Sequence, residues 1–284
     1  MITLAFALLL TTAPMEAPQD IPAVCDPASG VETDWVACAG ALPEGSQLQR
    51  LARLYGASEA YQNRDYAAAE RLFDQVGDFG PYASDSLYTF RADTWRQVGR
   101  DKEATADARA AWELLSGEAA TQEGSPAAGA AEAEDRRRFL LSLILPILKA
   151  GRDPAFEEAF AAYRALPVKD VEGYATLALV LEQLGDFSGA LEASLVAVKA
   201  EPANAGYLNN HCYILVRAGR AAEGLPFCEK AVQGAPQIGA VRHSLAAALA
   251  GAGRCAEAEA ALAEARRLEP ATVLYQQPLA CVAA

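Results

Sequence analysis

Apolar residues recur every three or four positions from residue 50 to residue 272, the spacing of helices with one buried face. The apolar stretches come in pairs, with a glycine and a polar residue between the two and a proline after the second. A glycine ends a helix because it readily adopts a left-handed backbone, and a proline stops one because it lacks an N–H. The pattern therefore predicts an all-α chain of repeated helical hairpins. Both markers keep a 34-residue interval, as Gly151, Gly185, Gly219 and Gly253 and as Pro202, Pro236 and Pro270.

Small side chains recur where the two helices of each predicted hairpin would touch. They let the helix axes approach closely. The third hairpin departs from this pattern, because larger residues fill its columns and Pro146 interrupts its first helix, so we expect a kink or looser packing there. The first-helix column reads Ala57, Ala92, Ile144, Ala178, Cys212 and Ala246, and the second-helix column reads Ala69, Ala104, Phe156, Ala190, Gly224 and Ala258.

This register resembles the tetratricopeptide repeat (TPR), a 34-residue helix–turn–helix unit. The resemblance implies a right-handed superhelical solenoid. Two TPR-like units are expected over residues 50–118 and four TPR units over residues 137–272. Their bounds are 50–83, 85–118, 137–170, 171–204, 205–238 and 239–272.

Three segments lie outside the repeats. Residues 119–136 are acidic and rich in alanine, and they lack the bulky apolar residues that would order them. We expect a flexible insertion there, with a helix extension or a partner-regulated segment as alternatives. Residues 18–49 are expected to form an irregular, disulfide-pinned N-terminal cap, and residues 273–284 a C-terminal capping helix.

The N-terminus indicates export. Residues 2–10 are continuously apolar, too short a run to span a bilayer but typical of the core of a signal peptide. We expect residues 1–17 to be that signal peptide, although no basic residue precedes the apolar run. A buried N-terminal helix is the alternative. The mature chain is expected to be periplasmic or secreted, without direct insertion into a membrane.

The six cysteines fall into three local pairs separated by 13, 16 and 26 residues. Disulfides persist outside the reducing cytosol, so an even number of cysteines agrees with export. Free buried thiols are the alternative, and six cysteines allow 15 connectivities. In the repeat register, one pair would join the two helices of a hairpin, and another would fix the end of the array. The pairs are Cys25 and Cys38, Cys212 and Cys228, and Cys255 and Cys281.

Composition excludes several classes of function. The 284 residues carry 24 Lys and Arg against 37 Asp and Glu, a net charge of −13 that disfavours nucleic-acid binding. Two histidines cannot form a His-rich metal centre, and the common catalytic motifs are missing from the sequence. We therefore expect no enzyme activity, no metal and no cofactor. The charge favours a basic or neutral partner.

The resemblance also implies a binding surface, because the first helix of every TPR unit lines a concave face. Leucine and tyrosine beside an amide would suit an extended or helical peptide. The paired basic residues of the carboxylate clamp found in some TPR proteins are missing from this stripe. For each stripe residue, packing in the solenoid core is the alternative. The inward stripe, which also carries Glu182, includes Tyr61, Asp93, Arg96, Leu145, Leu179, Asn209, Tyr213, Arg217 and His243.

These observations lead to a functional hypothesis. The chain is expected to be a non-catalytic protein- or peptide-binding scaffold or adaptor in the cell envelope. A permanent structural subunit of an envelope complex is the first alternative. An accessory enzyme with an unrecognised site is the second.

Overall fold

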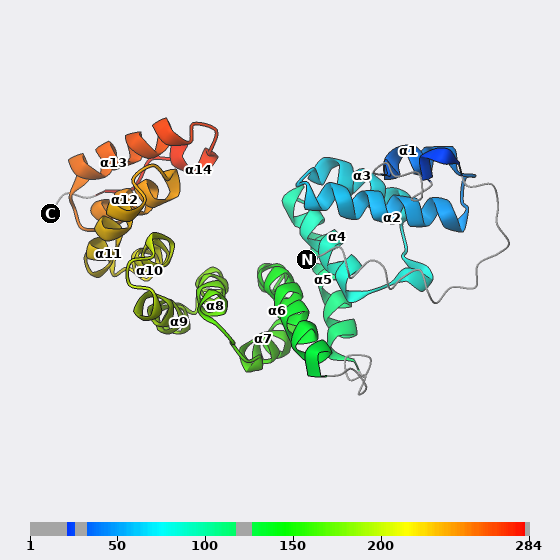
Figure 1. Ribbon diagram of the computed structural model, residues 1–284, viewed down its shortest axis with the longest axis horizontal. Helices are drawn as coiled ribbons and strands as arrows, with labels where there is room; N and C mark the ends of the chain where they lie inside the picture. Colours follow the sequence, from blue (N-terminus) through cyan, green and yellow to red (C-terminus); the bar gives the residue numbers. More distant parts are fainter. Residues whose placement is uncertain (1–21, 26–32, 118–126, 282–284) are drawn as a thin grey trace. The chain divides into compact units, whose positions relative to one another are not determined.

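The computed structural model describes residues 22–25, 33–117 and 127–281, and every regular element in these ranges is a helix (Figure 1). The predicted all-α class is confirmed. The chain divides after Leu166 into two compact units. In the ranges described, no helix is long and apolar enough to cross a membrane. The expected signal peptide, residues 1–17, lies outside them.

The described part of unit 1, which extends to Leu166, contains a short N-terminal helix followed by three helical hairpins. Within it α2 packs on α3, α4 on α5 and α6 on α7, and α4 contacts both α2 and α6. Short 3₁₀ turns lie at Ala23–Cys25 (η2) and Gly80–Tyr82 (η4). The helices are α1 (Trp35–Ala41), α2 (Gln47–Gln62), α3 (Tyr66–Val76), α4 (Asp85–Gln97), α5 (Asp101–Ser116), α6 (Ala127–Ala150) and α7 (Ala155–Ala165).

Unit 2, from Pro167 onward, consists of three more hairpins and one short helix. Each hairpin packs on the next, since α10 contacts α8, α9 and α12, and α11 contacts α12. The helices are α8 (Val171–Gln183), α9 (Phe187–Ala200), α10 (Ala205–Arg217), α11 (Ala221–Gly234), α12 (Gly239–Gly251), α13 (Cys255–Leu268) and α14 (Val273–Gln276).

The turns between paired helices show why the glycines recur. Gly185, Gly219 and Gly253 have φ values of 74°, 76° and 78°, the left-handed region that glycine enters without a Cβ clash. The third hairpin differs, because its left-handed residue is Arg152, with φ 53°. Gly151 is needed there for another reason. A Cβ on it would lie 2.4 Å from Thr105 Oγ1 on α5.

The small-residue columns lie in the core, as predicted. Ala57, Ala92, Ala178 and Ala246 are each fully buried between paired helices. The expectation of looser packing does not hold for the middle of α6. That helix continues through Pro146, and its apolar run is almost completely buried because α4, α5 and α7 all pack on it.

Two segment predictions need correction. Residues 127–136, expected to be part of a flexible insertion, form the first turns of α6. Alanine is the best helix former, which favours the alternative of a helix extension in this segment. Arg136 also pairs with Asp85 at the start of α4. Residues 118–126 lie outside the described part. The predicted C-terminal capping helix ends at Gln276, because Pro278 forces the residue before it into an extended conformation.

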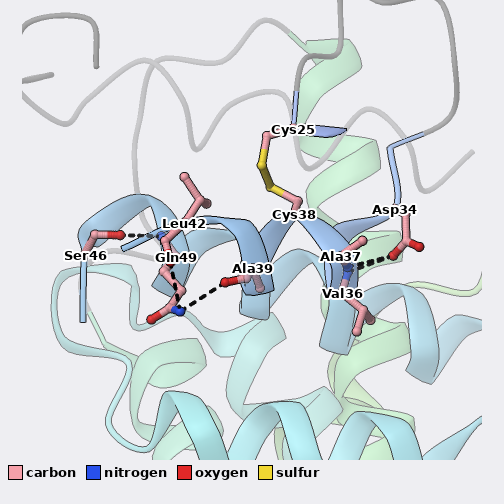
Figure 2. Close-up of a disulfide and its surroundings, with 9 residues drawn as sticks. All are labelled: Cys25, Asp34, Val36, Ala37, Cys38, Ala39, Leu42, Ser46 and Gln49. Carbon is pink, nitrogen blue, oxygen red and sulfur yellow. Dashed lines mark hydrogen bonds between the residues drawn. A yellow bond between two sulfur atoms is a disulfide. The ribbon is translucent and has the colours of Figure 1, made fainter. Parts of the chain in front are cut away.

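The N-terminal cap is more regular than predicted, since it contains α1. Asp34 begins this helix by accepting hydrogen bonds from the backbone N–H groups of Val36 (3.1 Å) and Ala37 (2.9 Å). Gln49 Nε2 of α2 donates to the carbonyl of Ala39 (3.0 Å). Figure 2 shows these contacts beside the Cys25–Cys38 disulfide, which ties η2 to α1.

All six cysteines pair as the local spacing suggested. Cys212–Cys228 joins α10 to α11 within one hairpin, with Cα atoms 5.5 Å apart. Cys255–Cys281 joins the first residue of α13 to the C-terminal segment. Each unit therefore carries at least one cross-link near an end of its array.

Candidate functional site

In unit 2, the predicted stripe brings an ion pair and an aromatic ring together. Arg217 Nη1 lies 2.8 Å from Glu182 Oε1 and 3.5 Å from the Tyr213 hydroxyl oxygen. The guanidinium carbon is 5.9 Å from the centre of the Tyr213 ring. Because Tyr213 hydrogen-bonds to Arg217 and Glu182 is negative, the pKa of the Arg217 guanidinium is raised. We call Leu179, Glu182, Asn209, Tyr213 and Arg217 the α8–α10 cluster.

The members of the α8–α10 cluster differ in exposure. The Glu182 side chain is 9% exposed and the Arg217 side chain 49% exposed, so the cation reaches solvent while its partner is buried. Leu179 occupies the repeat position of Tyr213 on the preceding first helix and is 42% exposed. The cluster therefore offers solvent an apolar side chain, an aromatic ring and a positive charge.

Asn209 adds an acceptor to this surface. Its Oδ1 atom is buried and has no hydrogen-bond partner in the described part of the chain. Asn209 lies one helical turn before Tyr213, so the two side chains project from the same face of α10. A buried amide oxygen without a donor costs free energy. Asn209 as a whole is only half-buried, so a rotation of its side chain would bring this oxygen to an N–H of a ligand and remove that cost.

His243, the last residue of the predicted stripe, is part of the core. It is buried, and its ring stacks on Tyr275 with centroids 5.1 Å apart. Burial lowers the pKa of His243. The prediction that His243 lines an accessible groove is therefore wrong, because the C-terminal segment covers it.

A buried Ser–His pair also lies in unit 2. Ser194 Oγ of α9 is 2.7 Å from His211 Nδ1 of α10, and the His211 ring meets Phe227 edge-on at 4.7 Å. Both residues are buried, and burial lowers the pKa of His211. A serine nucleophile needs an open approach for its substrate. This pair lacks one, so it is a satisfied hydrogen bond of the core.

In unit 1, the stripe forms a closed network. The Tyr61 hydroxyl donates to Asp93 Oδ2 at 2.9 Å, and Arg96 Nε donates to Asp93 Oδ1 at 2.9 Å. The Tyr61 ring stacks on Phe90 with centroids 5.0 Å apart. Burial and the Asp93 charge raise the pKa of Tyr61. The three predicted residues thus meet, but they hydrogen-bond mainly to one another.

Leu145 does not line a groove. It is completely buried within unit 1, along with the leucines one turn away on α6. The apolar run of α6 faces three neighbouring helices, which leaves no solvent side for this residue. For Leu145, packing in the core is the correct interpretation.

A hollow beside this region was not predicted. It has a volume of about 370 Å³ and lies where the end of α4, the start of α5 and the end of α6 meet, lined by Arg96, Asp101, Lys102, Ala104, Thr105, Ile147, Ala150 and Gly151. No single stretch of sequence signals it, because it forms from three helix ends. The described residues contain no group of three or more His, Cys, Asp or Glu placed to hold a metal ion.

Comparison with known proteins bears on the fold. No protein-family model and no curated protein matches the sequence. A tetratricopeptide repeat protein from Parabacteroides merdae is similar in structure, with a TM-score of 0.59 and 11% identity over 85% of this chain and 87% of that one.

Two further TPR structures align more loosely. One is the C-terminal part of a TPR repeat-containing protein from Cytophaga hutchinsonii (TM-score 0.45, 15% identity, 78% of this chain and 82% of that one). The other is YrrB, described as a TPR protein with an unusual peptide-binding site (TM-score 0.38, 13% identity, 78% and 95%). The 34-residue register and the likeness to the Parabacteroides protein together make this chain a tetratricopeptide repeat protein in fold.

Proposed function

We propose that the chain is a non-catalytic scaffold that binds a protein or peptide through the α8–α10 cluster. The observation that carries this proposal is that Asn209, whose Oδ1 has no hydrogen-bond partner in the described residues, lies on the face of α10 that also carries Tyr213 and the half-exposed Arg217. Leu179 is exposed at the repeat position of Tyr213 on α8. Apolar contact gives affinity, and a backbone N–H of the ligand fits the acceptor. This combination suits an extended peptide segment.

The chemistry of the peptide follows from the charges. Arg217 already has a buried partner in Glu182, and the chain as a whole carries a net charge of −13. An acidic peptide would be repelled over most of the surface. The fitting partner is a neutral or basic segment with an apolar side chain to lie against Leu179 and Tyr213.

We place this function outside the cytosol, in the periplasm or the extracellular space. Three disulfides and the apolar run at residues 2–10 support that location. A permanent subunit would need a large apolar patch on its second helices. On the second helices α3, α5, α7, α9, α11 and α13 the exposed large apolar side chains are Leu114, Leu195 and Val196, too few for a large patch, which favours the adaptor.

The test is selection of a random peptide library on the immobilised oxidised chain. We expect enriched neutral or basic peptides that bind the wild type and lose at least about tenfold in affinity with Asn209→Ala plus Tyr213→Ala, since truncating a central contact costs about 1–2 kcal/mol. Leu195→Ala plus Val196→Ala is the matched control on the opposite helix of the hairpin. Equal loss in both variants, or no enrichment, would remove the cluster as a binding site.

A further inference from the structure

The last residues of unit 2 form a strap that turns back along α13. The strap, residues 269–281, leaves the end of α13, forms the short helix α14 and returns to the first residue of α13 (Figure 1). There the Cys255–Cys281 disulfide fixes its far end. A segment of 13 residues is thus attached at both ends of one helix.

The strap is held on the hairpin α12/α13 mainly through Tyr275. The Tyr275 hydroxyl donates to Glu269 Oε2 at 3.1 Å, and Arg266 Nε donates to the Tyr275 carbonyl at 2.7 Å. The ring stacks on His243. Glu269 Oε1 accepts from the Gly239 N–H at 2.8 Å and so satisfies the first turn of α12.

The second half of the strap depends on the cross-link. After Gln276 the chain has no helix, and Leu279 and Cys281 pack at the edge of an apolar cluster. The buried members of that cluster include Leu249 and Leu262, the latter fully buried. A short extended segment gains little from local structure, so its position is set by the disulfide and by Leu279.

The Cys255–Cys281 disulfide is the accessible one. Cys255 and Cys281 are both partly exposed, whereas Cys212 and Cys228 are each 0% exposed. The Cys212–Cys228 disulfide is also enclosed by Ala248 and by further apolar side chains of α10, α11 and α12. Thiol–disulfide exchange requires a thiolate to reach a sulfur atom, so exposure decides which bridge reacts in the folded chain.

We propose that Cys255–Cys281 is a reducible latch, which a dithiol opens in the folded protein to release residues 277–281 of the strap from α12/α13, while Tyr275 keeps the first half in place. A thiolate of the dithiol attacks Cys281 Sγ, the S–S bond breaks, and the electron pair leaves on Cys255 Sγ. That sulfur lies in the first turn of α13, where backbone N–H groups stabilise a negative charge.

The mixed disulfide joins one sulfur of the dithiol to Cys281 Sγ. The second thiolate of the dithiol then attacks that dithiol sulfur, and the Cys281 thiolate leaves. Two electrons and two protons pass to the chain, and the dithiol becomes a disulfide. The released residues uncover the edge of the apolar cluster against which Leu279 packs. Because the reaction is reversible, oxidation closes the latch again.

The first test measures the order of reduction. The oxidised full chain is treated with dithiothreitol at pH 8 without denaturant, quenched with N-ethylmaleimide and analysed by peptide mass spectrometry. We expect Cys255 and Cys281 to be labelled at least about tenfold faster than Cys212 and Cys228. Equal rates, or faster labelling of Cys212 and Cys228, would overturn the proposal.

The second test follows the strap by hydrogen exchange. In the reduced form, the amides of Gln277 and of residues 279–281 are expected to exchange faster, while those of α10 and α11 keep their protection. Cys255→Ser plus Cys281→Ser should show the same fast exchange without reductant, at unchanged helicity. Cys212→Ala plus Cys228→Ala is the matched control and should leave the strap protected. A strap equally protected in the oxidised, reduced and serine forms would refute the latch.

Discussion

Arg217 of α10 lies 2.8 Å from Glu182 of α8, one repeat earlier. The pair links the first helices of two successive hairpins at the surface where the stripe residues gather. Glu182 is buried and Arg217 is half exposed, so the glutamate depends on the arginine more than the reverse. The ion pair therefore both holds two repeats together and supplies the positive charge of the proposed binding surface.

Removing Arg217 should destabilise unit 2 because it leaves the Glu182 carboxylate buried without its cation. We expect Arg217→Ala to lower the free energy of unfolding by about 1–2 kcal/mol, less than the roughly 3–5 kcal/mol of a fully buried pair, because Arg217 reaches solvent. Urea unfolding measures the change. Adding Glu182→Gln should restore part of the loss, and a double variant less stable than Arg217→Ala would contradict this interpretation.

The repeat register could be predicted from sequence because the same pattern of small residues recurs in successive hairpins. Ala57, Ala92 and Ala178 share a column and share full burial. Each occurrence supports the others, since every hairpin needs the same close approach of its helices. The all-α class and the paired helices were therefore predictable without structural information.

The exposure of each stripe residue was not predictable in this way. Leu145 and Leu179 share a column, yet they are 0% and 42% exposed. His243 shares the column of Asn209 and is buried because Tyr275 stacks on it. A column fixes which way a side chain points from its own helix. What lies over it depends on other segments: for Leu145 these are the helices packed on α6, and for His243 the strap.

Gly151 should be required by a steric contact and not by its backbone angle. A Cβ there would lie 2.4 Å from Thr105 Oγ1 and 2.5 Å from Thr105 Cγ2. We expect Gly151→Ala to cost about 1–3 kcal/mol of unfolding free energy, as overpacking does. Thermal unfolding of Gly151→Ala with Thr105→Ala should show recovery.

Gly219→Ala is the matched control for that experiment. Its Cβ would meet nothing within 4 Å, but its φ of 76° disfavours alanine. It should cost about 1 kcal/mol, and Thr105→Ala should not rescue it. Rescue of both glycine variants, or of neither, would show that the Thr105 contact is not the cause.

The Cys212–Cys228 disulfide should raise the free energy of unfolding mainly by restricting the unfolded chain. It closes a loop of 16 residues in the unfolded chain, which corresponds to about 3 kcal/mol by chain entropy. Cys212→Ala plus Cys228→Ala should lower the unfolding free energy by that order. The difference in unfolding free energy between this variant and the wild type should vanish when both are unfolded in reductant. A difference that persists in reductant would be due to lost packing.

Acid should weaken unit 2 through its two buried histidines. Burial lowers the pKa of both His211 and His243 below the ordinary value of 6.5, with Arg220 adding to the effect at His211. The unfolded chain therefore takes up protons near pH 6.5 before the folded chain does. The stability contributed by the neutral histidines is fully present above that pH and falls as the pH drops toward the pKa values of the folded chain.

We expect the melting temperature to decrease between pH 7.5 and 5, with hydrogen exchange rising first in α10 and α12. His211→Asn plus His243→Asn should flatten this dependence, and an equally steep decrease in that variant would assign the effect to carboxylates instead.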